Sequence, residues 1–305
     1  MTILDGKSLS LSIQDSLKSQ VSALNPKPKL VVILVGQDAP SLAYVNMKAK
    51  ACQNVGIIGE ILRFSQESSQ DQILKEIARL NADKTVNGIL VQLPLPKHFD
   101  THAILEAIAP QKDVDGFHPI NVGRVQCGLE KQDKNQSGDD NQNSTTHSST
   151  KTDIGFSPAT PLGVMELLKA YNIELQGKNV AIIGASNIVG KPLAQLMLNA
   201  GATISICHIF TRDISVFTRS ADIVCVGVGK VNLITKEHIK DGAIIIDIGI
   251  NRLNNGKLCG DVDFENVSKK ASFITPVPGG VGPMTIAALL QNTLKAYYIQ
   301  NSQNL

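Results

Sequence analysis

Short apolar runs alternate with longer amphipathic segments along most of this chain, and that alternation restricts its possible folds more than any other feature. The runs are rich in β-branched residues and cover residues 30–35, 60–64, 88–93, 179–183, 203–206, 223–226 and 243–248. Such runs are typical of strands buried on both faces, as in parallel sheets that carry helices on each side. The expected fold class is therefore α/β, with ligands bound at the carboxyl ends of the strands.

One polar segment interrupts this pattern. Residues 130–153, EKQDKNQSGDDNQNSTTHSSTKTD, contain no strongly apolar side chain and predict a solvated, disordered loop. Its His147 has no partner at metal-ligand spacing, so no metal site is expected. The segment divides the chain into two α/β domains. The expected division is 1–125 for the first domain, 126–157 for a polar insertion, 158–275 for the second domain, and 276–305 for a loop and a C-terminal helix, of which 284–300 packs back on the first domain.

Composition excludes several classes of protein. With 305 residues, 43% of them hydrophobic, the chain can bury a full core in about two domains. A net charge of +2 gives no electrostatic footprint for nucleic acid or a membrane surface, so neither is expected as a partner. Five widely spaced cysteines without a CxxC pair indicate neither disulfides nor zinc. The N-terminal stretch MTILDGKSLSLSIQD lacks the features of a signal peptide, which favours a cytoplasmic location.

A glycine turn joins a strand to a helix in the second domain. Residues 178–192 read KNVAIIGASNIVGKP, in which Gly184 permits a tight turn and Gly190 permits close packing of helix and strand. The free N–H groups at the start of the helix then suit a pyrophosphate. The motif is not a full GxGxxG, so an ordinary βα turn is the alternative. In its βαβ context it predicts a Rossmann-like, doubly wound parallel sheet that binds a dinucleotide.

The end of the next strand bears on the choice of dinucleotide. Residues 206–212, ICHIFTR, contain no acidic residue to hold the 2′-hydroxyl of NAD. Arg212 or Lys191 could instead face a 2′-phosphate, which favours NADP without excluding NAD. His208 fits a packed histidine at a strand end better than a catalytic residue.

Three features of the first domain could meet at one site. Tyr44 and Lys48 are four residues apart in an expected helix, so they share one face and could act on one bound group. The alternative is a lysine that extends past a packed tyrosine to reach solvent. Gln92 ends a strand in VQLPLP, and Asp113 and Asp115 lie in the glycine-containing turn KDVDGF.

Near the C-terminus, residues 276–285 read PVPGGVGPMT. Clustered glycines mark places where the backbone approaches a ligand closely, and Pro278 and Pro283 stiffen the frame around them. The segment is therefore expected to present main chain rather than side chains to a ligand.

Together these motifs give the chain a close resemblance to a known family over nearly its whole length. They are YVNMK at 44–48, VQLPLP at 91–96, KDVDGFHPINVGR at 112–124, GASNIVGKP at 184–192, DIGINR at 247–252 and TPVPGGVGPMT at 275–285. In this order they resemble the bifunctional methylenetetrahydrofolate dehydrogenase/cyclohydrolase family.

The resemblance implies two reactions at one site. The first is NADP-dependent oxidation of 5,10-methylenetetrahydrofolate to 5,10-methenyltetrahydrofolate, and the second is hydrolysis to 10-formyltetrahydrofolate. The first domain would bind folate, the second NADP, and the protein would form a homodimer through its cofactor domain. A family member with one activity only, or a non-catalytic nucleotide-binding protein, is the alternative.

The resemblance also implies roles for individual residues. Lys48 would carry a proton in the hydrolysis, Gln92 would hydrogen-bond Lys48, Tyr44 would orient the folate, and Asp115 would accept from the pterin ring. Further substrate contacts would come from Val91, Leu93, Pro278, Gly279, Gly280, Val281 and Gly282. Cofactor contacts would come from Gly184, Ala185, Ser186, Ile188, Val189, Gly190, Arg212 and Ile250.

Some positions depart from the family pattern. Ala185 stands where many members have arginine, and Ile209 where many have another basic or polar residue, and both positions serve the 2′-phosphate. Ala159 replaces a frequent cysteine, to which no essential chemistry is assigned. The insertion at 130–153 is longer than usual and is not expected to affect catalysis.

Overall fold

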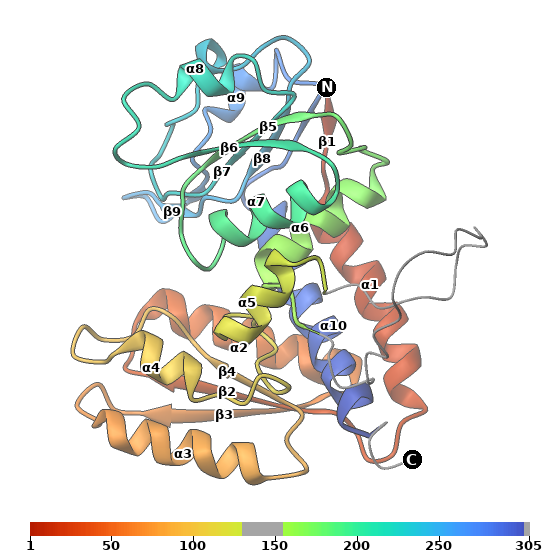
Figure 1. The fold of residues 1–305 in the computed structure, drawn as a ribbon, viewed down its shortest axis with the longest axis vertical. Helices are drawn as coiled ribbons and strands as arrows, with labels where there is room; N and C mark the ends of the chain where they lie inside the picture. Colours follow the sequence, from red (N-terminus) through yellow and green to blue (C-terminus); the bar gives the residue numbers. More distant parts are fainter. Residues whose placement is uncertain (130–154, 302–305) are drawn as a thin grey trace.

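Two parallel sheets, linked by long helices, form the protein (Figure 1). The computed structural model describes residues 1–129 and 155–301. The loop predicted at 130–153 lies outside the described residues. The α/β class and the parallel sheets predicted from the apolar runs are confirmed.

The smaller sheet has the order β3–β2–β4. Its strands are β2 (Lys29–Val35), β3 (Ile58–Phe64) and β4 (Gly88–Val91). In β2, Leu30, Val32 and Leu34 face one apolar cluster, whereas the alternate residues face another. Helices α3 (Gln70–Ala82) and α4 (Thr101–Glu106) cover one face, and α2 (Ala39–Val55) with two further helices covers the other (Figure 1). Burial on both faces explains the uninterrupted apolar run in β2.

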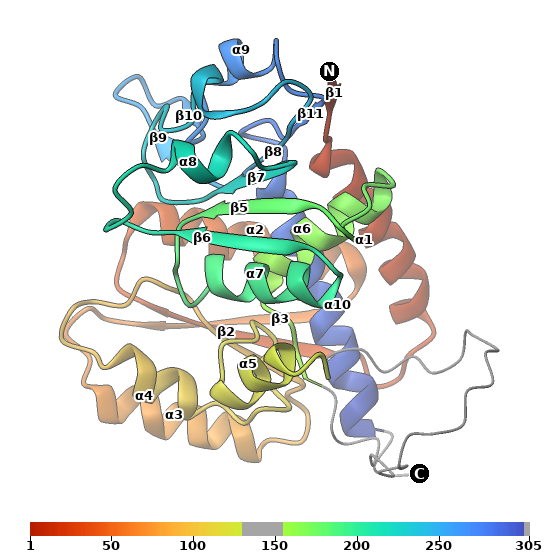
Figure 2. The same ribbon diagram turned by 45° about the horizontal axis from the view of Figure 1, so that its top comes forward.

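The larger sheet has the order β1–β11–β8–β7–β5–β6, with all neighbours parallel (Figure 2). Its strands are β1 (Thr2–Ile3), β5 (Asn179–Ile183), β6 (Thr203–Cys207), β7 (Ile223–Val226), β8 (Ile244–Asp247) and β11 (Phe273–Ile274). The order reverses between β5 and β7, because β6 lies on one side of β5 and all later strands lie on the other. Such a switch point is the usual ligand site of a doubly wound sheet.

Helices cover both faces of the larger sheet as well. One face carries α6 (Ala159–Ala170) and α7 (Gly190–Asn199), and the other carries α8 (Ser215–Thr218), the 3₁₀ turn Lys236–His238 and α9 (Phe264–Val267). Helix α5 (Pro119–Gln126) packs against α7. A short antiparallel pair, β9 (Asn251–Arg252) and β10 (Leu258–Cys259), follows β8.

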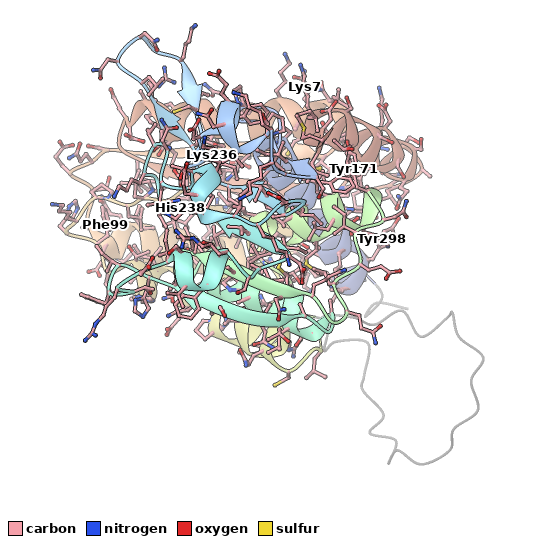
Figure 3. All side chains as sticks on the ribbon, turned by 90° about the horizontal axis from the view of Figure 1, so that it is seen from above. Lys7, Phe99, Tyr171, Lys236, His238 and Tyr298 are labelled. Carbon is pink, nitrogen blue, oxygen red and sulfur yellow. The ribbon has the colours of Figure 1, made fainter. Side chains whose placement is uncertain are left out.

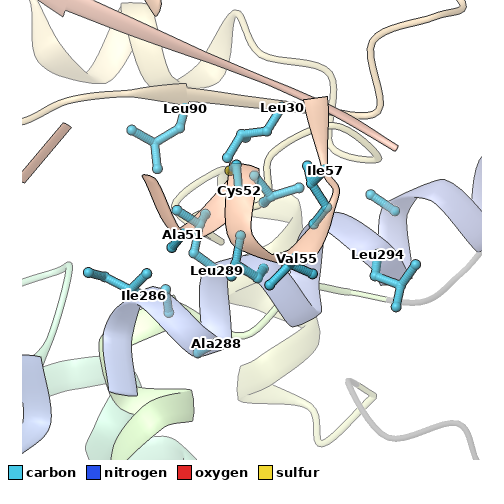
Figure 4. Packing of buried hydrophobic residues seen from close by; sticks show 14 of the residues in the cluster. Leu30, Ala51, Cys52, Val55, Ile57, Leu90, Ile286, Ala288, Leu289 and Leu294 are labelled. Atoms are coloured by element: carbon cyan, nitrogen blue, oxygen red, sulfur yellow. The ribbon is translucent and has the colours of Figure 1, made fainter. Parts of the chain in front are cut away.

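Two helices run between the sheets. Helix α1 (Gly6–Ser22) follows β1, and α10 (Val281–Asn301) packs on α1, α2 and α6. Leu289 and Leu294 of α10 are buried in the same cluster as Leu30 of β2 (Figure 4). Because α10 shares its core with both sheets, the two halves form one packed body.

The first residues of the chain do not pack with the rest of the expected first domain, 1–125. Thr2 and Ile3 pair with Phe273 and Ile274, so the chain begins in the larger sheet before α1 enters the first half. A two-residue strand is too short to carry a periodic signal in the sequence. Within the described ranges, no helix is long and apolar enough to cross a membrane.

Candidate active site

A buried lysine on α2 is hydrogen-bonded to the end of β4. Lys48 is 7% exposed, and its Nζ donates to Oε1 of Gln92 at 3.0 Å. The Gln92 amide is oriented by its own donor, since Nε2 donates to the Leu93 carbonyl at 2.7 Å. Burial lowers the pKa of the Lys48 amine, and the nearby Asp115 carboxylate opposes this shift. The pair forms because Gln92 directly follows β4 and, two residues after Leu90, lies on the sheet face that packs against α2.

Asp115 lies at the same end of the sheet. Ile89 of β4 donates to the Lys112 carbonyl at 2.7 Å and pairs with Asp113, so residues 112–115 run beside β4 toward Gln92. Desolvation raises the pKa of Asp115 to about 6, whereas the Lys48 charge lowers it. The structure therefore brings Lys48, Gln92 and Asp115 into one electrostatic cluster.

The neighbouring Asp113 holds the turn that presents Asp115. Its carboxylate accepts from the Gly116 and His118 backbone N–H groups at 3.1 and 2.8 Å and from Asn121 Nδ2 at 2.8 Å. Asp113 is 1% exposed, so its acceptors are used within the protein. Of the two carboxylates in KDVDGF, Asp115 is the one open to a ligand.

A cleft of about 680 Å³ lies between α1, α2 and the loops of the larger sheet. Tyr44, Ile250 and the loop 276–283 line it. Lys48, Gln92 and Asp115 do not line this cleft. On α2, Lys48 lies farther round toward Val45 and Cys52, which are buried against the sheet. Tyr44 lines the cleft from α2, about one helical turn before Lys48, and burial raises the pKa of its phenol.

The loop at 276–283 is fixed by the start of α1. Lys7 N–H donates to the Gly279 carbonyl at 2.9 Å, and Ser10 Oγ donates to the Pro283 carbonyl at 2.8 Å. A Cβ on Gly280 would lie 2.6 Å from the Pro276 carbonyl oxygen, so this glycine is required by packing inside the loop. A Cβ on Gly282 would instead meet Ile250 Cδ1 at 3.8 Å, on the cleft side. The glycines thus serve loop closure as well as the open backbone surface expected from the sequence.

The glycine turn predicted for the cofactor stands at the switch point. Gly184 has φ +117°, and a Cβ there would lie 2.9 Å from the Gly227 carbonyl oxygen after β7. Ser186 Oγ accepts from the N–H groups of Val189 and Gly190 at 3.1 and 3.3 Å, so it caps the start of α7. Ala185 and Ile188 belong to the same exposed turn.

The segment after β6 borders this turn, since Gly184 N–H donates to the Cys207 carbonyl. Arg212 is exposed there, whereas Lys191 Nζ donates to Asn187 Oδ1 at 2.7 Å. The first acid beyond β6 is Asp213, whose carboxylate accepts from the backbone N–H and hydroxyl of Ser215 at 2.8 and 2.6 Å. It is therefore committed to capping α8.

Two buried aspartates that were not predicted as site residues hold the loops next to the glycine turn. Asp247 accepts from Gly249, Asp261 and Val262 N–H groups, each at 3.0 Å. Asp261 accepts from Val228 and Gly229 N–H groups at 2.7 and 3.0 Å. Burial, aided by the adjacent Asp261 carboxylate, raises the pKa of Asp247 to about 6. The DIGINR motif could have pointed to Asp247, but nothing local marked Asp261.

Comparison with known proteins gives two family matches. Residues 4–115 match the catalytic domain of tetrahydrofolate dehydrogenase/cyclohydrolase, and residues 158–301 match its NAD(P)-binding domain. The chain is 54% identical to the bifunctional protein FolD of Helicobacter hepaticus, with 100% of this chain and 99% of that protein aligned.

Solved structures are similar over comparable lengths. One is the bifunctional FolD dehydrogenase/cyclohydrolase of Campylobacter jejuni, at 51% identity and a TM-score of 0.89, covering 99% of each chain. Another is the FolD of Trypanosoma brucei in complex with NADP and an inhibitor, at 33% identity and a TM-score of 0.88, covering 100% of this chain and 99% of that one.

Proposed function

The chain belongs to the tetrahydrofolate dehydrogenase/cyclohydrolase family, and from this premise we infer that it is a bifunctional enzyme of folate metabolism. It oxidises 5,10-methylenetetrahydrofolate to the 5,10-methenyl form with NADP, and it hydrolyses the methenyl form to 10-formyltetrahydrofolate. The observation that carries this proposal is the buried Lys48 hydrogen-bonded to Gln92, because a proton-carrying amine has no use in a protein that only binds nucleotides.

We assign Lys48 the proton transfers of the hydrolysis. A lysine moves protons near neutral pH when burial lowers its pKa, which is the direction found here. Gln92 positions the amine by accepting one of its protons. Water attack on the methenyl carbon then has a proton carrier close by that is largely shielded from solvent.

Tyr44 and Asp115 would bind and orient the substrate. As a carboxylate, Asp115 accepts hydrogen bonds from the pterin N–H groups, and charge-assisted pairs of this kind fix orientation strongly. Tyr44 offers an aromatic ring to the cleft. Val91 and Leu93 flank Gln92 but pack against the apolar cluster on the α3–α4 face of the sheet, whereas the backbone of residues 278–282 lines the cleft.

The turn 184–190 and the segment after β6 fit NADP. Gly184 approaches the Gly227 carbonyl too closely to carry a side chain of its own, and α7 begins at the same turn, at Gly190. Because Asp213 is hydrogen-bonded to Ser215, no acid at the end of β6 would repel a 2′-phosphate. Arg212 is the exposed cation of that segment and would bind this phosphate. When bound, NADP supplies the acceptor for the hydride that leaves the methylene carbon. Ile250 would lie against its nicotinamide end.

We also propose a homodimer formed through the larger sheet, and a cytoplasmic location. Strand β6 has no partner on its outer side in the sheet order, and apolar side chains are exposed along it and just beyond it. All five cysteines are free, which suits a reducing compartment.

A spectrophotometric assay tests the two activities separately. With methylenetetrahydrofolate, the enzyme should reduce NADP in preference to NAD. With methenyltetrahydrofolate alone, it should accelerate hydrolysis without any cofactor. Because Ala185 and Ile209 remove two familiar contacts to the 2′-phosphate, hydrolysis without reduction of either cofactor would identify a monofunctional cyclohydrolase instead. The absence of both activities would refute the proposal.

A further inference from the structure

The turn that carries Asp115 packs against residues 155–158, here named the strap. Gly116, the residue after Asp115, has φ +75°, and a Cβ there would lie 2.7 Å from the Pro158 nitrogen and 2.8 Å from the Phe156 carbonyl oxygen. The two stretches of backbone are therefore in direct contact, with no room for a side chain between them. Whatever holds the strap in place also holds the turn beside Asp115.

A buried amide on α10 joins the turn to the strap. Asn292 is 3% exposed, and its Nδ2 donates to the Val114 carbonyl and to the Ser157 carbonyl, each at 2.9 Å. An amide nitrogen carries two protons, so both are used in these two bonds. Val114 immediately precedes Asp115 in the chain. One side chain therefore fixes the backbone next to the Asp115 carboxylate and the strap at the same time.

The same helix holds the strap at a second point. Lys295 Nζ donates to the Gly155 carbonyl at 2.9 Å and lies 5.5 Å from the centroid of the buried Phe156 ring. Lys295 follows Asn292 by three residues, so both belong to one face of α10. Further along the helix, Tyr298 is 43% exposed at the side of the molecule, as seen from above (Figure 3). Asn292 thus lies in the buried middle part of α10.

The first turn of α10 belongs to the cleft. Val281 and Gly282 line the cleft, and the helix continues without a break to Asn292 and beyond. From Gly282 to Asn292 it rises by about 15 Å, at roughly 1.5 Å per residue. One continuous helix therefore sets the separation between the cleft wall and the turn that carries Asp115.

This arrangement supports the carboxylate from outside its own turn, whereas Asp113 supports it from within. Charge-assisted hydrogen bonds are short and depend on geometry, so a carboxylate that binds the pterin N–H groups has to be held in place. We propose that Asn292 is a positioning residue for folate binding, which holds the Asp115 turn against the strap without touching the substrate. This proposal rests on the folate function argued above.

The first test replaces Asn292 by alanine. The space left by the amide adjoins two carbonyls and suits a water molecule, so the fold should be kept, which thermal unfolding checks. The Kd of an unreactive folate analogue, measured by fluorescence titration at pH 7, should rise about tenfold, because the carboxylate is loosened but not removed. The KM for NADP should stay within twofold.

An analogue Kd within twofold of the wild type would overturn the proposal, whereas a wild-type protein that does not bind the analogue would refute the folate function itself. Asn292→Ser retains one O–H donor beside the two carbonyls and takes the place of the alanine variant if that variant does not fold. Its Kd should lie between those of the wild type and a tenfold weaker binder, and a Kd equal to that of the wild type would count against the proposal.

A double-mutant cycle separates positioning from a general effect on stability. A residue that acts through Asp115 loses its effect when Asp115 is absent, whereas independent effects add. In an Asp115→Ala background, Asn292→Ala should therefore change the Kd of the analogue by less than twofold. A further tenfold rise in that background would show that Asn292 acts independently of Asp115, and the proposal would fall.

The neighbouring residue on α10 supplies the matched control. Thr293 is fully buried, but its Oγ1 donates to the Leu289 carbonyl within the helix at 2.8 Å. Thr293→Val removes this bond and leaves the turn and the strap untouched, so the Kd of the analogue should stay at the wild-type value. A tenfold rise in this control would show that any disturbance of α10 weakens folate binding, which would remove the specific role of Asn292.

Discussion

At the scale of single residues, the environment of Lys48 determines which of its protonation states is available. The amine is almost fully buried, has one hydrogen bond to a neutral amide, and is near a carboxylate whose own pKa is raised. Desolvation makes the charged amine less favourable, and the carboxylate makes it more favourable. The balance leaves Lys48 easier to deprotonate than a surface lysine, as proton transfer near neutral pH requires.

Lys48→Met should abolish the hydrolysis. Methionine has a similar length and removes a buried charge, so the fold should be kept. General acid–base catalysis contributes about 10²- to 10⁴-fold, and the rate of methenyl hydrolysis should fall by that order. The loss of methenyl absorbance measures the rate, and thermal unfolding checks the fold. Lys75→Met, which replaces an exposed lysine on α3, serves as the control, and a Lys48→Met enzyme with full hydrolase activity would contradict the role of Lys48.

The raised pKa of Asp115 predicts that folate affinity depends on pH. Its pKa is raised to about 6, so the carboxylate that accepts from the pterin is largely ionised at pH 7, and only about a tenth of it is ionised at pH 5. The Kd of an unreactive folate analogue, measured by fluorescence titration, should therefore rise about tenfold between pH 7 and pH 5. A Kd that stays constant down to pH 5 would show that an ionised Asp115 is not needed for binding.

At the scale of elements, Asp247 and Asp261 tie together the loops at the carboxyl ends of three strands. Asp261 holds the backbone after β7, and its Oδ1 accepts from Asn251 Nδ2 at 2.8 Å. Asp247 ends β8, and its backbone N–H donates to Thr275 Oγ1 after β11 at 2.7 Å. The loops next to the switch point thus depend on two carboxylates that are both buried.

Asp261→Asn should therefore impair the dehydrogenase selectively. One carboxylate oxygen would be replaced by an amide nitrogen, which donates and cannot accept, so a buried donor loses its partner at a cost of about 1 to 3 kcal/mol. We expect the KM for NADP to rise about tenfold while hydrolysis stays within twofold, because Lys48 lies in the other half of the molecule.

A second aspartate supplies the control for Asp261→Asn. Asp222 is also hydrogen-bonded, to Asn179 N–H and Lys240, but it precedes β7 at the amino end of the strands. Asp222→Asn should leave the KM for NADP unchanged. A parallel loss of both activities in Asp261→Asn would indicate a purely structural role.

The same elements show what the sequence can and cannot reveal. Strands β2, β5 and β7 were predicted almost residue by residue, because strands buried on both faces consist of consecutive apolar residues. By contrast, β1 and β11 are two residues long and exist only through their pairing. Asp261 acts on residues more than 30 positions earlier in the chain, a distance over which no local pattern operates.

The candidate site, too, could be predicted from the sequence only in part. The spacing of Tyr44 and Lys48 placed them on one helix, and the bond from Lys48 to Gln92 follows from the position of Gln92 at the end of β4. The roles assigned to the site residues stay predictions until they are tested.

At the scale of the whole molecule, the two sheets end in edges of different character. Strand β3 is an edge of the smaller sheet and carries charged residues such as Glu60 and Arg63. Strand β6 is an edge of the larger sheet, with Ile206 43% exposed, followed by Ile209 and Phe210 at 91% and 86%. Natural edges that stay unpaired usually carry charge, so the apolar edge at β6 is the one suited to a second copy of this chain.

Ile206→Lys should therefore convert the proposed dimer to monomer. A lysine in the proposed interface would bury an unpaired charge, and charge on an edge strand opposes pairing. Sedimentation at micromolar concentration should show a dimer for the wild type and a monomer for the variant. Ile58→Lys is the matched control, because Ile58 is 50% exposed on the edge strand β3 and its replacement should leave the dimer intact. Hydrolysis should persist in both variants, since both replaced side chains are exposed and neither belongs to the buried Lys48–Gln92 pair. A wild-type protein that sediments only as a monomer would contradict the proposal.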